Sequence, residues 1–343
     1  MPANKPVLVT GASGFIAIHC IIQLLEQGYH VRGTLRSLNR ETELRNTLAK
    51  FVQADDRLAF VQADLLSDTG WPDAAHGCDY VLHIASPFPF EAPEDENDLI
   101  RPARDGTLRV LRAAVHHEVK RVVLTSSVAA ISAGHPRRKT HLDEKDWSLP
   151  DSWTIDPYPK SKTLAERAAW EFMKNLPQGH PLELAVINPG YVLGPLPDTH
   201  QRTSGELIQQ LLGGKLPGLA WIQFNGVDVR DVAAAHLAAM TTPEAAGKRF
   251  PCVTQQFWLR DAAEILNKHF ETRGYKIKTN VIPSWAVYIV ALFLKQVRPK
   301  LRSLGRETFI DTTLIRKTLN WKPRSLEETL VDMAESMIEL KLV

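Results

Sequence analysis

The sequence of 343 residues contains only three cysteines, and their positions exclude two kinds of stabilisation. Cys20, Cys78 and Cys252 are odd in number and far apart, so they match neither a disulfide framework nor the paired spacing of a structural metal site. We therefore expect a reducing, cytoplasmic location and no bound metal. The chain also enters an apolar segment almost at once, which leaves no room for a signal peptide.

Long apolar runs and an excess of one charge are also missing. The most apolar segment, residues 285–294, has ten residues, about half the length of a membrane span, and we interpret it as a helix that is buried or faces a partner. The formal net charge is +2, and the short basic run at residues 137–139 is typical of a solvated loop. We therefore expect neither a nucleic-acid partner nor a membrane partner.

The first 27 residues, in contrast, contain a strong local pattern. An apolar run at residues 7–9 predicts a buried strand, and the apolar spacing through residues 15–25 predicts a helix. Between them lies Gly11-x-x-Gly14-x-x-Ala17, a variant of the dinucleotide-binding fingerprint. The two glycines allow the backbone to approach a pyrophosphate, and a helix N-terminus favours its negative charge. An ordinary tight turn is the alternative interpretation.

The same alternation of strand and helix continues through the first half of the chain. It predicts a Rossmann-type α/β fold, a doubly wound parallel sheet with a smaller C-terminal substrate lobe. We assign residues 1–194 to the NADP-binding domain, with part of residues 220–255 returning to it, and residues 195–343 mainly to the substrate lobe. The predicted strands are 29–35, 58–61, 121–127 and 182–187, and residues 79–87 are predicted as a further strand with its exit loop. The predicted helices are 41–51, 97–117 and 163–174, and the last is preceded by a first turn that tolerates Pro157 and Pro159.

The end of the second strand indicates which dinucleotide is bound. An acidic residue there would hold the ribose 2′-hydroxyl of NAD, but the sequence has Arg36, with Arg40 four residues later. Guanidinium groups suit a 2′-phosphate, so we predict NADP(H). Simple surface arginines are the alternative.

Further polar and aromatic residues follow the next strands, at the edge where a parallel sheet binds its ligand. Asp64 could accept a hydrogen bond from the adenine amino group, or cap a helix, or do both. His83 lies inside a predicted strand, and a packed structural histidine is favoured over a catalytic one. Four residues after this strand should lie near cofactor or substrate: Ala85, Ser86, Phe88 and Phe90.

Three residues have the chemistry of carbonyl reduction. Tyr158 could protonate the oxyanion that hydride transfer creates, although a free tyrosine has a pKa near 10. Lys162, one helical turn later, would lower that pKa, and the Ser127 hydroxyl could hold the same carbonyl oxygen. Alone, Tyr-x-x-x-Lys is a frequent accident, but here it follows a dinucleotide fingerprint and a crevice strand.

Together these motifs resemble the extended short-chain dehydrogenase/reductase family. The resemblance is strongest to the branch of dihydroflavonol 4-reductases, cinnamoyl-CoA reductases, and yeast and bacterial aldehyde and methylglyoxal reductases. It extends over nearly the full length, and it rests on Val9 to Ala17, Arg36 with Arg40, Asp64-Leu65, His83 to Pro87, Leu124 to Ser127, Tyr158-x-x-Ser161-Lys162, Asn188-Pro189-Gly190, Asp228 to Ala233 and Asn320 to Arg324.

The resemblance implies roles for individual residues. Ser127, Tyr158 and Lys162 match the catalytic trio of the family. The residues that would hold NADP(H) are Gly11, Ser13, Gly14, Phe15, Ile16, Arg36, Arg40, Asp64, Leu65, Ala85, Ser86, Tyr158, Lys162, Pro189 and Val192. The residues that would line the substrate pocket are Phe88, Phe90, Ile155 and Tyr191.

Two departures bear on the substrate. Residues 155–158 are Ile-Asp-Pro-Tyr, whereas cinnamoyl-CoA reductases carry Asn-Trp-Tyr at the catalytic tyrosine, which argues against a CoA thioester. The segment between Ser127 and Tyr158 is also shorter than in flavonoid enzymes. We therefore expect NADPH-dependent reduction of a small-molecule aldehyde or ketone, by a monomer or homodimer. The alternatives are a nucleotide-sugar epimerase or dehydratase that uses NAD(P), and a non-catalytic NADP sensor.

Overall fold

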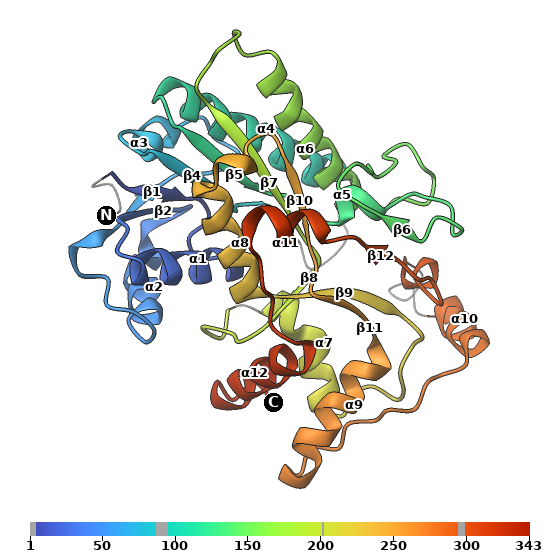
Figure 1. The fold of residues 1–343 in the computed structure, drawn as a ribbon. Helices are drawn as coiled ribbons and strands as arrows, with labels where there is room; N and C mark the ends of the chain where they lie inside the picture. The colour runs from blue at the N-terminus through green and yellow to red at the C-terminus, as the bar shows by residue number, and fades with distance from the viewer. Residues whose placement is uncertain (1–4, 87–94, 201, 294–298) are drawn as a thin grey trace.

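A seven-stranded parallel sheet forms the larger lobe of the protein in the computed structural model, which describes residues 5–86, 95–200, 202–293 and 299–343 (Figure 1). The strand order is β10-β7-β5-β4-β1-β2-β3. The order reverses between β1 and β4, and the carboxyl ends of strands at such a switch point form the ligand crevice. The predicted Rossmann-type sheet is therefore confirmed. Its strands are β1 Val7–Val9, β2 Val31–Leu35, β3 Leu58–Gln62, β4 Tyr80–His83, β5 Arg121–Thr125, β7 Glu183–Pro189 and β10 Arg249–Cys252.

Helices cover both faces of this sheet, so its strands are apolar on both sides. In β1, Val7 and Val9 pack with helix α1, whereas Leu8 packs on the opposite face with α4, because successive side chains of a strand alternate. One face is covered by α1 and α8, and the other by α3, α4 and α6 (Figure 1). The bounds of these helices are α1 Phe15–Glu26, α3 Trp71–Ala75, α4 Asn97–His116, α6 Pro157–Lys174 and α8 Val229–Thr241, and α2 is Glu41–Leu48.

Helix α6 begins at residue 157, so its first turn contains Pro157 and Pro159, as the sequence predicts. Asp156 is the N-cap with an extended backbone, and Pro157 occupies the first helical position, where a missing N–H costs nothing. Tyr158 and Lys162 therefore lie on one continuous helix.

The smaller lobe is built on a second sheet of three strands in the order β11-β9-β8. Strand β9 belongs to this sheet, whereas the helix and strand that follow it, α8 and β10, pack on or join the larger sheet. The strands are β8 Tyr191–Leu193, β9 Gln223–Asp228 and β11 Gln255–Trp258, and the helices of the lobe are α7 Arg202–Leu212, α9 Leu259–Phe270 and α12 Leu326–Glu339. The chain therefore leaves the larger sheet and returns to it.

The remaining strands and helices are short. Strands β6 His141–Leu142 and β12 Phe309–Ile310 pair in parallel, and the other helices are α5 Ala129–Ser132, α10 Ser284–Phe293 and α11 Thr313–Leu319. The 3-10 helices are η1 Leu38–Arg40, η2 Asp55–Arg57, η3 Pro243–Ala245, η4 Glu271–Arg273 and η6 Pro299–Arg302.

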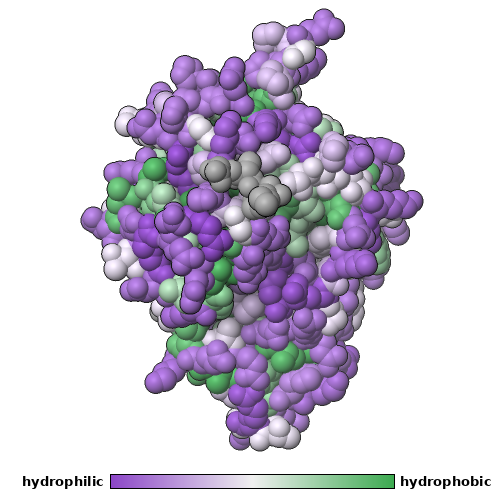
Figure 2. Space-filling view, turned by 60° about the vertical axis from the view of Figure 1, so that its left-hand side comes forward, coloured by the Kyte–Doolittle hydropathy of each residue, from purple (hydrophilic) through white to green (hydrophobic). Residues whose placement is uncertain are grey.

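The surface in Figure 2 is mostly hydrophilic, with small separate apolar patches. Within the described ranges, no helix has the length and apolar character that crossing a membrane requires. The same ranges contain no cluster of three or more histidine, cysteine or acidic side chains that could hold a metal ion.

Candidate active site

The glycine turn has the geometry that a pyrophosphate needs. Gly11 has a φ of +66°, and a Cβ at this position would lie 3.0 Å from the Cα and Cβ of Ala85. Its N–H donates to the Thr34 hydroxyl at 3.0 Å. Gly14 is the N-cap of α1, which has no side-chain cap and no acidic residue in its first turn. No side chain caps the free N–H groups in the first turn of α1. These groups are therefore available to a dinucleotide pyrophosphate.

Thr10 ties this turn to the end of β4, a role that the sequence analysis missed. Its hydroxyl oxygen accepts from the backbone N–H groups of Ile84 and Ala85, both at 3.0 Å. Because both lone pairs are used, the hydroxyl must donate to Nδ1 of His83, which is 2.9 Å away. Burial, together with the charge of Lys162, lowers the pKa of His83 to about 3, so this histidine is a neutral part of the core.

The two arginines expected at the 2′-phosphate differ in their surroundings. Arg36 follows β2 directly and is exposed, and its carbonyl accepts from the Gln62 side chain at 3.0 Å. Arg40 donates from Nε to Glu43 Oε2 at 3.2 Å, and His200 contacts the other oxygen of Glu43. A 2′-phosphate would therefore have to displace Glu43 from Arg40, whereas Glu43 does not bind Arg36.

Asp64 lies in a turn and not at the start of a helix. Its Oδ1 accepts from the N–H of Leu66 at 2.9 Å, whereas the next helix, α3, begins at Trp71. The helix-cap interpretation of Asp64 was therefore wrong, and an adenine contact stays a prediction. Leu65 packs against Gly106 of α4, where a Cβ would approach Leu65 to 2.8 Å.

Ser127 and Tyr158 meet at the crevice. The Ser127 hydroxyl accepts from the N–H of Ala129 at 3.1 Å, lies 3.4 Å from the Pro189 carbonyl oxygen and is also hydrogen-bonded to Tyr158. Burial raises the pKa of Tyr158 to about 12, and the bond to Ser127 offsets part of the increase. The tyrosine is therefore a protonated donor near neutral pH.

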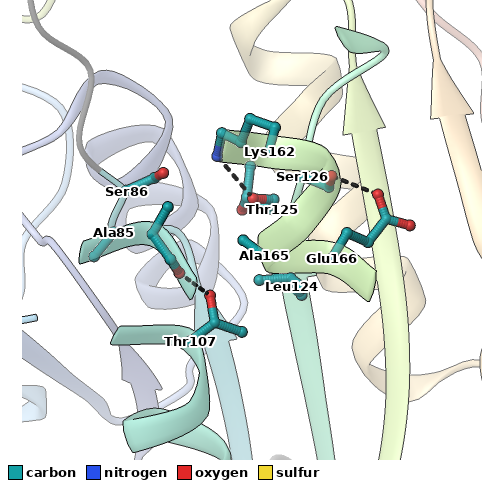
Figure 3. Close-up of a pocket in the computed structure, with 10 residues that line it drawn as sticks. Ala85, Ser86, Thr107, Leu124, Thr125, Ser126, Lys162, Ala165 and Glu166 are labelled. Atoms are coloured by element: carbon teal, nitrogen blue, oxygen red, sulfur yellow. Dashed lines mark hydrogen bonds between the residues drawn. The ribbon is translucent and has the colours of Figure 1, made fainter. Parts of the chain in front are cut away.

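Lys162 is buried, and its Nζ donates to the Thr125 carbonyl oxygen at 3.3 Å (Figure 3). Burial lowers its pKa to about 8, and the negative charge of Glu166 opposes that decrease. That Lys162 favours the phenolate of Tyr158 stays a prediction. The ammonium group is directed to a backbone carbonyl, and burial dominates at Tyr158.

A small pocket lies between Lys162 and the residues that follow β4. Figure 3 shows Lys162 and Ala165 of α6 opposite Ala85 and Ser86, with Thr107 of α4 beneath them. The structure thus brings together predicted residues that are up to 77 positions apart, from Ala85 to Lys162.

The remaining predicted residues lie around this centre. Pro189 ends β7, and its carbonyl accepts from the N–H of Val128 at 2.9 Å. Val192 is half-buried against the core of the larger lobe. Ile155 lies two residues before α6, and Tyr191 of β8 stacks in a tilted geometry on Phe224 with ring centroids 5.2 Å apart. Phe88 and Phe90 lie outside the described residues.

A parallel sheet with an uncapped glycine turn at its switch point, and a buried Tyr–Lys pair beside it, defines a dinucleotide-dependent enzyme of the Rossmann class. The sequence profile of the NAD dependent epimerase/dehydratase family matches residues 7–251. Cinnamoyl-CoA reductase 1 of Petunia hybrida is 40% identical over 329 residues, 95% of this chain and 93% of that protein.

Two further similarities concern one yeast enzyme. NADPH-dependent methylglyoxal reductase GRE2 of Saccharomyces cerevisiae is 32% identical over 364 residues, 98% of either chain. The crystal structure of yeast methylglyoxal/isovaleraldehyde reductase Gre2 complexed with NADPH matches with a TM-score of 0.81 and 29% identity, covering 98% of this chain and 99% of that chain. The protein belongs to the family of extended short-chain dehydrogenases/reductases, to which the epimerase/dehydratase profile also corresponds. Within that family it lies in the dihydroflavonol 4-reductase and aldehyde reductase-like branch. It is an oxidoreductase.

Proposed function

We propose that this protein reduces an aldehyde or ketone to the alcohol with NADPH. The observation that carries the proposal is the hydrogen-bonded pair of Ser127 and Tyr158 with Lys162 one turn away, at the crevice edge where the glycine turn lies. The named activities of the yeast and Petunia relatives support it. Exposed Arg36, in place of an acidic residue, supports NADPH over NADH and counts against an NAD-retaining epimerase.

When bound, NADPH supplies the hydride. The protein has to hold the carbonyl and protonate its oxygen. Ser127 hydrogen-bonds the carbonyl oxygen, and Tyr158 delivers its phenolic proton to that oxygen as negative charge develops. Because its pKa is about 12, Tyr158 carries this proton over the whole neutral range. Lys162, with a pKa of about 8, is mostly protonated at pH 7 and supplies positive charge at the same place.

The substrate we propose is a small carbonyl compound. Ile155 and the Tyr191 ring, together with Phe88 and Phe90, would provide an apolar, partly aromatic wall. Residues 155–157 before Tyr158 are Ile-Asp-Pro, whereas a cinnamoyl-CoA reductase would have Asn-Trp before its tyrosine. We therefore rank simple aldehydes and ketones above cinnamoyl thioesters. We place the protein in a reducing compartment, since its three cysteines are buried free thiols.

The decisive experiment measures NADPH oxidation against methylglyoxal, short and aromatic aldehydes, β-ketoesters, a dihydroflavonol and a cinnamoyl thioester, with NADH in parallel. We expect turnover of aldehydes or ketones with NADPH, and a loss of about 100-fold or more in kcat for Tyr158→Phe. Silence across the panel despite tight NADP binding would refute the proposed reaction. Full activity of Tyr158→Phe would refute the assigned proton donor.

A further inference from the structure

One buried carboxylate beneath this site has no part in the proposed mechanism. Glu166 lies on α6, one helical turn after Lys162, and its side chain is 0% exposed. A buried carboxylate is costly unless it is paired and hydrogen-bonded. The hydrogen-bond partners of Glu166 therefore indicate which segments the carboxylate holds together.

Four donors surround the two oxygens of Glu166. Oε2 accepts from the Ser126 hydroxyl at 2.5 Å (Figure 3). The same oxygen accepts from Asn188 Nδ2 at 2.8 Å. Oε1 accepts from Arg249 Nε and from Trp170 Nε1, the latter at 3.3 Å. Every acceptor position is thus used, and only an ionised carboxylate satisfies all four donors.

Two of these partners directly precede residues of the site, and they lie at the ends of different strands. Ser126 directly precedes Ser127, and Asn188 also donates to the Ser127 carbonyl oxygen at 3.2 Å. Asn188 directly precedes Pro189 at the end of β7. Glu166 therefore joins the β5 turn, the end of β7 and helix α6 at a single point.

Arg249 of strand β10 neutralises the carboxylate. A second guanidinium nitrogen, Nη1, donates to the carbonyl oxygens of Glu144 and Asp146 at 2.9 and 2.8 Å. The guanidinium carbon lies 3.6 Å from the centroid of the Trp147 ring. Arg249 is thus fixed from a second side by the loop that leads toward α6. The cation cannot turn away from Glu166 without breaking these contacts.

We propose that Glu166 is a positioning residue of the reductase site: its buried carboxylate holds the Ser126–Ser127 turn and the end of β7 in place, and keeps a negative charge next to Lys162. This inference rests on the proposed function. The titratable and charged groups around Lys162 are His83 from β4, Tyr158 and Glu166 on its own helix, and Arg249 from β10 behind Glu166.

Replacing Glu166 by glutamine tests the role with little change in shape. Glutamine places an NH₂ group against two of the four donors in either orientation, so it cannot keep all four hydrogen bonds. We expect kcat to fall about 10- to 100-fold with KM for NADPH within about threefold of wild type. Because Lys162 loses a neighbouring negative charge, the alkaline limb of the kcat–pH profile should move down by about one pH unit.

Two matched variants separate positioning from simple stabilisation. Glu171→Gln makes the same change on the same helix, but Glu171 is exposed, so kcat and the pH profile should stay as in wild type. Arg249→Met removes the cation instead, and it should move the alkaline limb up, because the Glu166 charge then acts on Lys162 unopposed. Both buried variants should lower the Tm, so only the opposite pH shifts distinguish the two roles.

The outcomes decide between the proposals. A purely structural ion pair would lower the Tm in both buried variants while leaving kcat and the alkaline limb of folded enzyme unchanged, and this result would overturn the inference. If Glu166→Gln does not fold, Ser126→Ala removes the 2.5 Å bond alone, and an unchanged kcat there would overturn it equally. Silence of the wild-type enzyme across the carbonyl panel would instead refute the proposed function, independently of Glu166.

Discussion

Two glycines with nearly the same backbone angle allow a controlled test of the dinucleotide turn. Gly11 and Gly77 have φ values of +66° and +68°. An alanine at Gly11 would meet Ala85 at 3.0 Å, whereas an alanine at Gly77 would meet nothing within 4 Å. Alanine at either position incurs the left-handed backbone penalty of about 1 kcal/mol. Only Gly11→Ala adds an overpacking cost, about 1–3 kcal/mol.

We therefore expect Gly77→Ala to lower the free energy of unfolding by about 1 kcal/mol and Gly11→Ala by about 2–4 kcal/mol, measured by urea unfolding without cofactor. The added methyl at Gly11 also lies where the backbone should approach the pyrophosphate. NADPH affinity, measured by titration calorimetry, should therefore fall at least about tenfold for Gly11→Ala and stay at the wild-type value for Gly77→Ala. Equal losses of stability would refute the contact argument, and unchanged affinity in Gly11→Ala would refute the placement of the cofactor.

Three further predictions follow from charge. Arg36→Asp should weaken NADPH binding at least about tenfold while changing NADH binding little, since only NADPH carries the 2′-phosphate; equal losses for both would exclude Arg36 as its ligand. The kcat should decline as the pH rises through about 8, where Lys162 loses its proton, and a flat profile up to pH of about 10 would contradict this. Burial lowers the pKa of His19 and His236 to about 4 and of His83 to about 3. The unfolded chain therefore binds these protons first, and acidification from pH 7 to about 5 should cost about 2 kcal/mol per histidine in urea unfolding; equal stability at both pH values would disagree.

The strands and helices of the first half of the chain could be predicted well, because the residues that determine each of them are close together in the sequence. The apolar run before Gly11 and the helical spacing after Gly14 lie within the first 27 residues, and the structure has β1 and α1 there. The start of α6 was predictable for a local reason as well. Proline is tolerated in the first turn of a helix, and the structure has Pro157 and Pro159 there.

The features that the sequence did not reveal depend on side-chain direction and on long-range pairs. Tyr-x-x-x-Lys spacing places Lys162 on the same face as Tyr158, but it does not tell that Nζ reaches the Thr125 carbonyl. Glu166 and Arg249 are 83 positions apart, and no periodicity links them. Thr10 looked like an ordinary strand residue, although a hydroxyl directly before a glycine turn was a usable signal.

Strand β10 is synthesised well after β7, the strand with which it pairs, and this order affects the nascent chain. Strand β7 pairs with β5 on one side and with residues 249–252 on the other, about 60 residues after β7 itself ends. Until those residues leave the ribosome, the nascent sheet has an unpaired apolar edge, and Glu166 is buried without its arginine. A ribosome stalled between β7 and β10 would thus release a chain prone to aggregate, and any shortened version of the protein must retain Cys252 to close its sheet.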